Sequence, residues 1–492
     1  MKKRMIALAM ALLLALCFVP AAAMAEPAVP FIGTGTAEDP YQLSSASDLA
    51  ALSQLVASGV GFAGEYFVFT ADITLPNNWT PIGTTKVNCF SGIIDGGGHK
   101  LTVPANEKAL IGFPCEAVLK NLNICGERID GNGVVSIYTT GISNKTAITI
   151  ENVTLLSGTN TTGSGFLGGY ASGSFAAVIR SCTVQSGVVV GCDGDRSNIG
   201  SFGGDFNGTI ENCVSYATVK GVDFVGGICG SKGQSIGQYT IRRCTFKGTV
   251  QATGNYVGGI SGSGYGGTNF GMESSPNAPC AVIENCSVSA TVSGGNYVGG
   301  ILGGEGATYQ CWDNGIGKIK NNSFSGKVSA TAANARIGGI VGYFAGLDKY
   351  NEIENNTYSA DCGAAKGIGF AAYVDTGCAT HETQSGAVYI NSGDQSTPLP
   401  DLKYVETYGS LEFVTQYFSK WEQNRTDDPL GADAGKLCRP VYPSHDDDPV
   451  QPRSVDSAKT GDAGIALYLV TGVLSVTGSC VLARRRAGEK EC

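Results

Sequence analysis

The chain has 492 residues, of which 71 are glycine and only 15% are charged, and its formal net charge is −9. This acidic balance argues against nucleic acid or an anionic membrane face as a partner. The 42% of hydrophobic residues argues against disorder, and the many glycines favour tight turns and stacked short strands over helices.

Residues 1–25 have the three-part layout of a secretory signal peptide. Basic residues at positions 2–4 precede an uncharged run from Met5 to Val19. A short segment with small residues at positions 23 and 25 then stands directly before Glu26. The run is shorter than the roughly 20 residues that span a bilayer. We therefore predict cleavage between Ala25 and Glu26, which makes this an exported chain.

Residues 26–84 are predicted to form an N-terminal capping segment. Ser47 begins the helix-like run 47–52, and its hydroxyl can accept a hydrogen bond from a backbone N–H of the first turn. Such a helix would cover the open end of a strand stack. An uncovered first strand would offer its unpaired edge to other chains.

A short strip recurs through residues 85–390. It begins with isoleucine, has a polar residue two places later, and continues with cysteine or asparagine. The copies with cysteine contain Cys182, Cys213, Cys244 and Cys286, those with asparagine contain Asn322 and Asn356, and earlier, weaker copies start at Leu119 and Ile150. Cysteines in one slot of a repeat indicate a buried column of free thiols rather than disulfide partners.

A second strip of paired glycines lies between these copies. It occurs at 166–169, 225–228, 257–260, 298–301 and 337–340. Strands this short cannot bury a face alone, so successive units must stack and share one core. Paired glycines allow either a turn with positive φ or a close approach of two backbones. The repeats therefore predict an all-β parallel solenoid with columns of equivalent side chains.

Residues 165–369 resemble the GLUG-motif repeats of bacterial cell-surface proteins and, more loosely, the pectate-lyase-like β-helix superfamily. The resemblance implies a right-handed parallel β-helix with caps at both ends. The C-terminal cap is expected over 391–438, where 411–421 has apolar residues at helical spacing. Residues 439–462, rich in proline and aspartate, are expected to form a polar linker.

The C-terminal end is expected to anchor the chain. Residues 463–483 contain no charge and are long enough for a transmembrane helix, and the basic tail 484–492 would stay in the cytoplasm. The motif before the span resembles the cell-wall sorting signal read by sortases. Sorting signals of this kind have proline at the second position of the motif, where this chain has Ala458. The motif residues are Ser457, Ala458, Lys459, Thr460 and Gly461.

This resemblance implies sortase cleavage between Thr460 and Gly461 and transfer to peptidoglycan of a Gram-positive-type wall. Plain membrane anchoring is the alternative, because Ala458 departs from the pattern. Either route places the bulk of the chain outside the cell.

The sequence predicts no catalytic, cofactor-binding or metal site. Asp193 and Asp195 could share a calcium ion, but a full calcium loop supplies six or more oxygens, so a polar turn is favoured. His99 is interpreted as a structural corner residue. No nucleophile elbow, zinc-binding helix or phosphate loop occurs.

Aromatic residues in the inserted loops are the candidate ligand contacts, because amphipathic rings suit glycans and proteins. They are Tyr265, Phe270, Tyr309, Trp312 and Tyr343. We predict a surface-anchored adhesin or display scaffold that is not an enzyme and that binds extracellular glycans or proteins. The alternative is a secreted carbohydrate-active β-helix enzyme, a polysaccharide lyase or a glycoside hydrolase.

Overall fold

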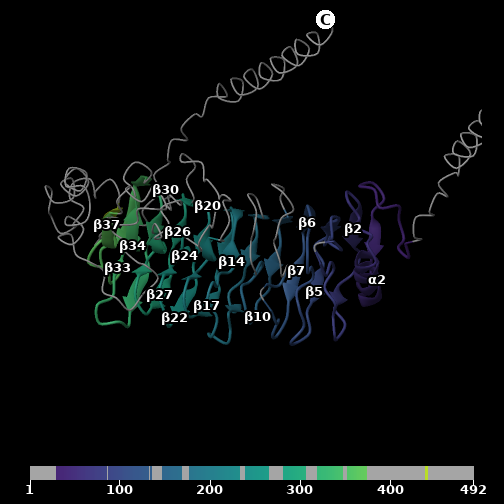
Figure 1. Cartoon of the computed structure of the whole chain (residues 1–492), viewed down its shortest axis with the longest axis horizontal. Helices are drawn as coiled ribbons and strands as arrows, with labels where there is room; N and C mark the ends of the chain where they lie inside the picture. The colour runs from purple at the N-terminus through teal and green to yellow at the C-terminus, as the bar shows by residue number, and fades with distance from the viewer. Residues whose placement is uncertain are drawn as a thin grey trace, which may run out of the picture. The chain divides into compact units, whose positions relative to one another are not determined.

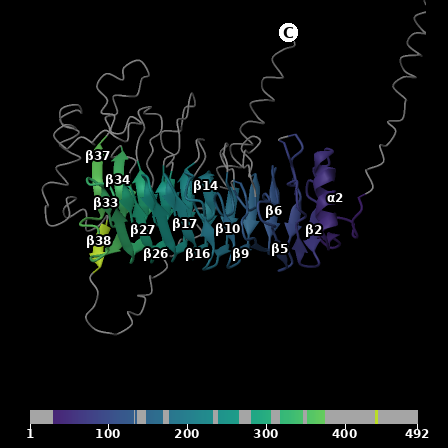
Figure 2. The same cartoon turned by 90° about the horizontal axis from the view of Figure 1, so that it is seen from below.

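The computed structural model describes the stacked part of the chain. The described residues are 29–85, 87–131, 133–135, 147–168, 177–232, 239–264, 281–305, 318–346, 352–373 and 438–441. All of them belong to the compact unit 1–443, whereas the second unit, 444–492, lies outside them. Apart from one helix, the regular secondary structure of the described residues is β-strand, and the strands follow one another as coils along one axis (Figures 1 and 2).

Two long sheets run along the stack, and both pair their strands in parallel. Sheet A contains β1 (Tyr41–Leu43), β2 (Tyr66–Phe69), β4 (Ile93–Asp95), β6 (Ala117–Lys120), β8 (Ile148–Glu151), β11 (Ala177–Arg180), β15 (Gly208–Glu211), β20 (Tyr239–Arg242), β25 (Ala281–Glu284), β30 (Lys318–Lys320) and β35 (Glu352–Glu354). Sheet B contains β3 (Ile73–Thr74), β5 (Lys100–Thr102), β7 (Asn123–Cys125), β9 (Thr154–Leu155), β12 (Thr183–Val184), β16 (Val214–Ser215), β21 (Thr245–Phe246), β26 (Ser287–Val288), β31 (Ser323–Phe324), β36 (Asn356–Ser359) and β38 (Cys438–Val441).

Three shorter parallel sheets complete the coils. Sheet C contains β10 (Asn160–Thr161), β13 (Val189–Val190), β17 (Thr218–Gly221), β22 (Thr249–Ala252), β27 (Thr291–Gly294) and β32 (Lys327–Ala330). Sheet D contains β18 (Val225–Gly226), β23 (Val257–Gly258), β28 (Val298–Gly299) and β33 (Ile337–Gly338). Sheet E contains β14 (Gly203–Phe206), β19 (Cys229–Lys232), β24 (Ser261–Ser263), β29 (Leu302–Glu305), β34 (Val341–Gly346) and β37 (Ile368–Tyr373).

Equivalent residues of the repeat are stacked directly on one another. Ile179 pairs in register with Ile210, and Ile210 pairs with Ile241. Cys182 and Cys213 are both buried in the same hydrophobic cluster as these isoleucines. This confirms the prediction of a parallel β-solenoid with columns of equivalent side chains around one shared core.

The helix α2 (Ala46–Ala57) lies at the N-terminal end of the stack (Figures 1 and 2) and buries Leu49 and Leu52. The N-cap is Ser45, not Ser47 as the sequence suggested, because Ser45 has extended backbone and its hydroxyl accepts a hydrogen bond from the Asp48 N–H. Strands β1 to β3 already belong to sheets A and B, so the boundary predicted at residue 85 falls inside the stack.

Asparagine marks the turn between sheets A and B. Asn152, Asn212 and Asn285 have φ values of 52°, 54° and 55°, in the left-handed region. Asparagine tolerates this conformation better than most residues. We call the first repeated strip the Ile-x-Asn-Cys strip. Its third residue is therefore a turn residue, and the residue after it points back into the core.

The paired glycines serve close backbone approach. Gly226, Gly258 and Gly299 all lack a positive φ. A methyl group on Gly258 would overlap the carbonyl of Ser261 in the same coil and the backbone of Ile301 and Gly303 in the next. Of the two explanations that the sequence left open, the structure therefore supports close packing between sheets D and E.

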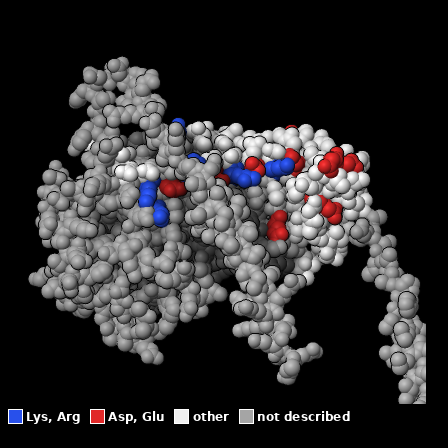
Figure 3. Space-filling view, turned by 90° about the horizontal axis from the view of Figure 1, so that it is seen from above, with Lys and Arg blue, Asp and Glu red and all other residues white. Residues whose placement is uncertain are grey.

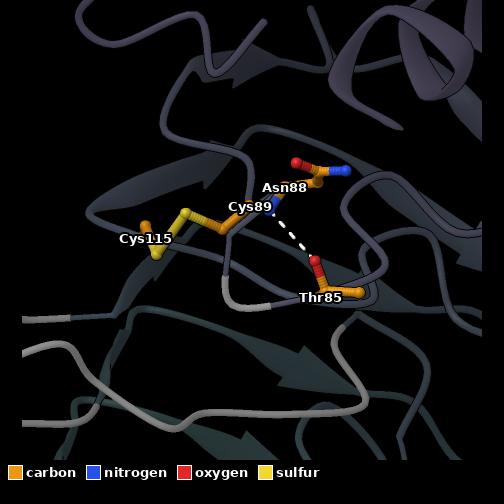
Figure 4. The surroundings of a disulfide bond; sticks show 4 residues. All are labelled: Thr85, Asn88, Cys89 and Cys115. Carbon is orange, nitrogen blue, oxygen red and sulfur yellow. Dashed lines mark hydrogen bonds between the residues drawn. A yellow bond between two sulfur atoms is a disulfide. The ribbon is translucent and has the colours of Figure 1, made fainter. Parts of the chain in front are cut away.

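A disulfide joins Cys89 to Cys115 across neighbouring coils near the N-terminal end (Figure 4). The turn before Cys89 is held by a hydrogen bond from the Asn88 backbone N–H to the Thr85 hydroxyl, 3.1 Å long. The bond closes a loop with a sequence separation of 26 residues.

The Cys89→Ser/Cys115→Ser variant is expected to lose about 3 kcal/mol of unfolding free energy, because the unfolded chain regains the freedom of that loop. Urea unfolding with and without a reductant measures the effect. Cys192→Ser, which removes a free thiol, is the control. If a reductant lowers the unfolding free energy of the double variant as much as that of the unmodified protein, the disulfide between Cys89 and Cys115 is contradicted.

The C-terminal strand β38 pairs with β36, so that Cys438 lies opposite Asn356. Residues 439–441, expected to begin the polar linker, therefore belong to a sheet. The predicted C-terminal helix over 411–421 and the predicted span 463–483 lie outside the described residues. Within the part of the chain that is described, no helix is long and apolar enough to cross a membrane.

Candidate functional site

One edge of the solenoid carries the variable connections between coils. From β14, β19, β24, β29 and β34 of sheet E, the chain enters sheet A of the next coil at β15, β20, β25, β30 and β35. These connections range from the single residue Asn207 to the segment 264–280. Because the strands on both sides are held in register, the bases of the connections are arranged in coil order along this edge.

Four of the predicted ligand contacts, Tyr265, Phe270, Tyr309 and Trp312, fall within these connections and lie outside the described residues. The fifth, Tyr343, was predicted wrongly. It lies in β34 with 1% of its surface exposed, and this burial raises the pKa of its phenol.

Tyr343 belongs to a column of aromatic rings. The ring of Tyr256 stacks on Phe224 with 5.1 Å between ring centroids and packs at a tilt against Tyr297 at 4.8 Å, and the ring of Tyr297 lies 5.3 Å from that of Tyr343. Phe224, Tyr256 and Tyr297 have φ values of 56°, 59° and 32°, which are strained for bulky residues. Gly304 leaves space for the Tyr256 ring, since a methyl group there would overlap it. The column is therefore a packing feature.

The sequence contains a signal for this column that is visible only when the repeat copies are compared. An aromatic residue stands directly before the glycine strip in three successive copies, at Phe224, Tyr256 and Tyr297. Repetition at a fixed place in the repeat predicts a ladder of stacked rings rather than a set of independent loop contacts.

The cysteine column is a hydrogen-bond ladder. The thiols of Cys213, Cys244 and Cys286 each donate to the isoleucine carbonyl one coil earlier, over 3.8, 3.6 and 3.7 Å. Burial raises the pKa of Cys213 and Cys286, so these thiols stay protonated. Protonated, buried thiols are poor nucleophiles, which argues against a catalytic role for Cys213 and Cys286.

Asparagine replaces cysteine in the last coils and makes the same bonds more strongly. The Asn322 amide donates to the Ile283 carbonyl over 2.8 Å and accepts from the Cys286 backbone N–H over 2.9 Å. Asn356 likewise donates to the Ile319 carbonyl over 2.7 Å. The exchange of cysteine for asparagine therefore preserves one structural function, which is to satisfy the buried backbone at the corner.

The acidic loop considered for calcium is occupied by an arginine. Arg128 binds both carboxylate oxygens of Asp193, over 2.6 and 2.8 Å. These hydrogen bonds hold the pKa of Asp193 below its ordinary value. Arg196 lies 4.0 Å from Asp130 and adds a second, looser ion pair between coils. The arrangement supports a polar turn whose charges connect neighbouring coils.

His99 lies 3.4 Å from Asp72 on the surface, consistent with a corner residue of the stack. Over the described ranges, no group of three or more histidine, cysteine or acidic side chains is close enough to hold a metal ion.

Charged side chains of opposite sign alternate along the outer face of sheet A, and Figure 3 shows acidic and basic residues following one another along the stack. We call this column the charge ladder. Its members, paired in register from coil to coil, are Asp95, Lys120, Glu151, Arg180, Glu211, Arg242, Glu284 and Lys320.

The ladder includes three short ion pairs. Lys120 lies 3.3 Å from Asp95, Arg180 lies 3.0 Å from Glu151, and Arg242 lies 2.8 Å from Glu211. Its sequence signal is the second residue of the Ile-x-Asn-Cys strip, which alternates between acid and base.

No family model matches the chain, so the resemblance to GLUG-motif repeats stays a prediction. Halomucin of Haloquadratum walsbyi is 27% identical over 215 residues, which cover 42% of this chain but 2% of halomucin. A crystal structure of a "putative immunoglobulin A1 protease" from Bacteroides ovatus aligns with a TM-score of 0.35 and 20% identity, covering 64% of this chain and 85% of that one.

Proposed function

We propose that the chain is a cell-surface-anchored, right-handed β-solenoid that presents variable segments to extracellular glycans or proteins, as an adhesin or display scaffold. The observation that carries this proposal is the shared edge where sheet E connects to sheet A. A rigid stack with variable connections along one edge is an arrangement that suits binding. The right-handed sense follows the strong preference of parallel crossover connections.

Export and anchoring are proposed from the two ends of the sequence. The predicted signal peptide would direct the chain out of the cell, and the motif at Ser457–Gly461 would be cleaved by a sortase and joined to peptidoglycan. Mass spectrometry of protein released from the wall tests this. A chain that ends at Thr460 supports sortase attachment, whereas a chain that retains 463–483 supports a membrane anchor.

Ligand binding is proposed for the segments 265–280 and 306–317. A glycan array and a surface-protein array probed with the exported chain would detect it. We expect the Tyr265→Ala/Phe270→Ala and Tyr309→Ala/Trp312→Ala variants to bind at least tenfold more weakly, because aromatic anchors dominate such contacts. Tyr216→Ala is the matched control, since this tyrosine is 40% exposed and directly follows β16 of sheet B, away from the shared edge. Equal binding by all three variants would contradict the proposal.

We propose that the chain binds without turning over its ligand. Release of reducing sugars or of unsaturated uronides from polysaccharides would show the opposite. Asp193 and Asp195 are the carboxylates of the one acidic loop considered for calcium, and Arg128 binds Asp193 with both terminal guanidinium nitrogens. Any such turnover should therefore be tested in the Asp193→Ala/Asp195→Ala variant. Turnover that disappears in this variant would replace the scaffold proposal with an enzyme.

A further inference from the structure

The repeat that builds the solenoid also creates a risk of mispairing. The strands of sheet A present isoleucine to the core at the same place in β11, β15, β20 and β25. The next corner residue, cysteine or asparagine, makes the same hydrogen bond in each coil. Neither the isoleucine column nor the corner therefore distinguishes a neighbouring coil from the coil beyond it, although the other inward position differs, being Ala177 in β11, Gly208 in β15 and Tyr239 in β20.

The outer face of sheet A does make this distinction. Each ladder residue from Lys120 to Glu284 lies opposite a residue of the other sign in the coil before and in the coil after. Members two coils apart have the same sign. A strand that skips one coil would therefore place acid opposite acid and base opposite base, and like charges directly opposite are unfavourable in a sheet.

The same rule applies between molecules. If a strand of sheet A pairs in register with its own counterpart in a second chain, identical residues face each other, and every charge of the ladder meets its like. Incomplete stacks expose strand edges during folding, and tandem repeats are prone to such exchange.

We propose that the charge ladder sets the order of the coils: it selects the neighbouring coil as the partner of each sheet A strand and rejects both a skipped coil and the equivalent strand of a second copy. The ion pairs are partly exposed, with side-chain exposures of 34% and 28% for Lys120 and Asp95 and 38% and 15% for Arg242 and Glu211. Each pair is therefore weak by itself and screened by salt. The selectivity comes from the repetition along the stack.

The experiment compares refolding of the exported chain from urea with three variants. Arg180→Glu/Arg242→Glu makes five consecutive members acidic. A ladder-inverted variant exchanges every member for the opposite charge and so keeps the alternation. Lys220→Glu/Lys247→Glu changes the net charge as much as the first variant, at positions outside the ladder on β17 and after β21. The measured quantity is the fraction recovered as native monomer, by size-exclusion chromatography and circular dichroism.

We expect at least threefold lower recovery for Arg180→Glu/Arg242→Glu, with the loss found in associated or misfolded species. The ladder-inverted and off-ladder variants should refold like the unmodified protein. In 1 M salt, where the screening length is about 3 Å, recovery of the unmodified protein should fall toward that of the acidic variant. Recovery of the acidic variant equal to that of the off-ladder control would overturn the proposal. So would a ladder-inverted variant that refolds as poorly as the acidic one.

Discussion

Gly258→Ala is expected to lower the free energy of unfolding by about 3 kcal/mol, at the upper end of the usual cost of overpacking. All three atoms that the new methyl group would meet are backbone atoms, from Ser261, Gly303 and Ile301. Backbone held in register by sheets D and E cannot move aside as a flexible side chain can. Urea unfolding followed by circular dichroism measures the loss.

Gly61→Ala is the matched control. Its φ is not positive, and the nearest atom to a new methyl group is the Cys89 carbonyl oxygen at 3.7 Å, an ordinary contact distance. We expect this variant to unfold at the same urea concentration as the unmodified protein. If both alanine variants unfold at the same urea concentration as the unmodified protein, the close approach of sheets D and E does not constrain position 258.

Asn322→Ala is expected to cost about 3 kcal/mol, because it leaves two buried backbone groups without their partner. The Cys286 N–H loses its acceptor and the Ile283 carbonyl loses a donor. Asn322 is 1% exposed, so water does not replace the amide. Thermal and urea unfolding measure the effect.

Asn322→Cys tests the interpretation that thiol and amide perform one function in the column. Cys182 shows that sulfur can take both parts, since it accepts from the Val153 N–H over 3.5 Å and lies 3.7 Å from the Ile150 carbonyl. We expect this variant to lose less than half as much stability as Asn322→Ala. Equal losses would mean that position 322 requires the amide itself, and the shared function would have to be abandoned.

The predicted ligand contacts show where sequence reasoning was limited. Tyr343 is predicted from the sequence as one of the loop aromatics, yet it is buried against Tyr297 and Tyr256. An aromatic residue in a loop and one in a ladder look alike in a single repeat. They differ only when several copies are aligned and the ring recurs at the same place.

The N-terminal cap shows a second limit. Both Ser45 and Ser47 precede a helix-like run, and residue type does not distinguish them. The structure selects Ser45, because its extended backbone directs its hydroxyl at the Asp48 N–H, while Ser47 already lies inside the helix. A serine within the helix cannot serve as its N-cap.

The sequence by itself determined the architecture, because a repeated strip of isoleucine, asparagine and cysteine can bury its apolar face only by stacking on the next copy. Only the tertiary structure decided how each column is used. Register between coils brings Glu151, Arg180 and Glu211 together on the outer face, although about 30 residues separate each from the next. Likewise, the positions of sheets D and E decide that Gly258 serves close packing rather than a turn, since contact between backbones depends on how the coil closes.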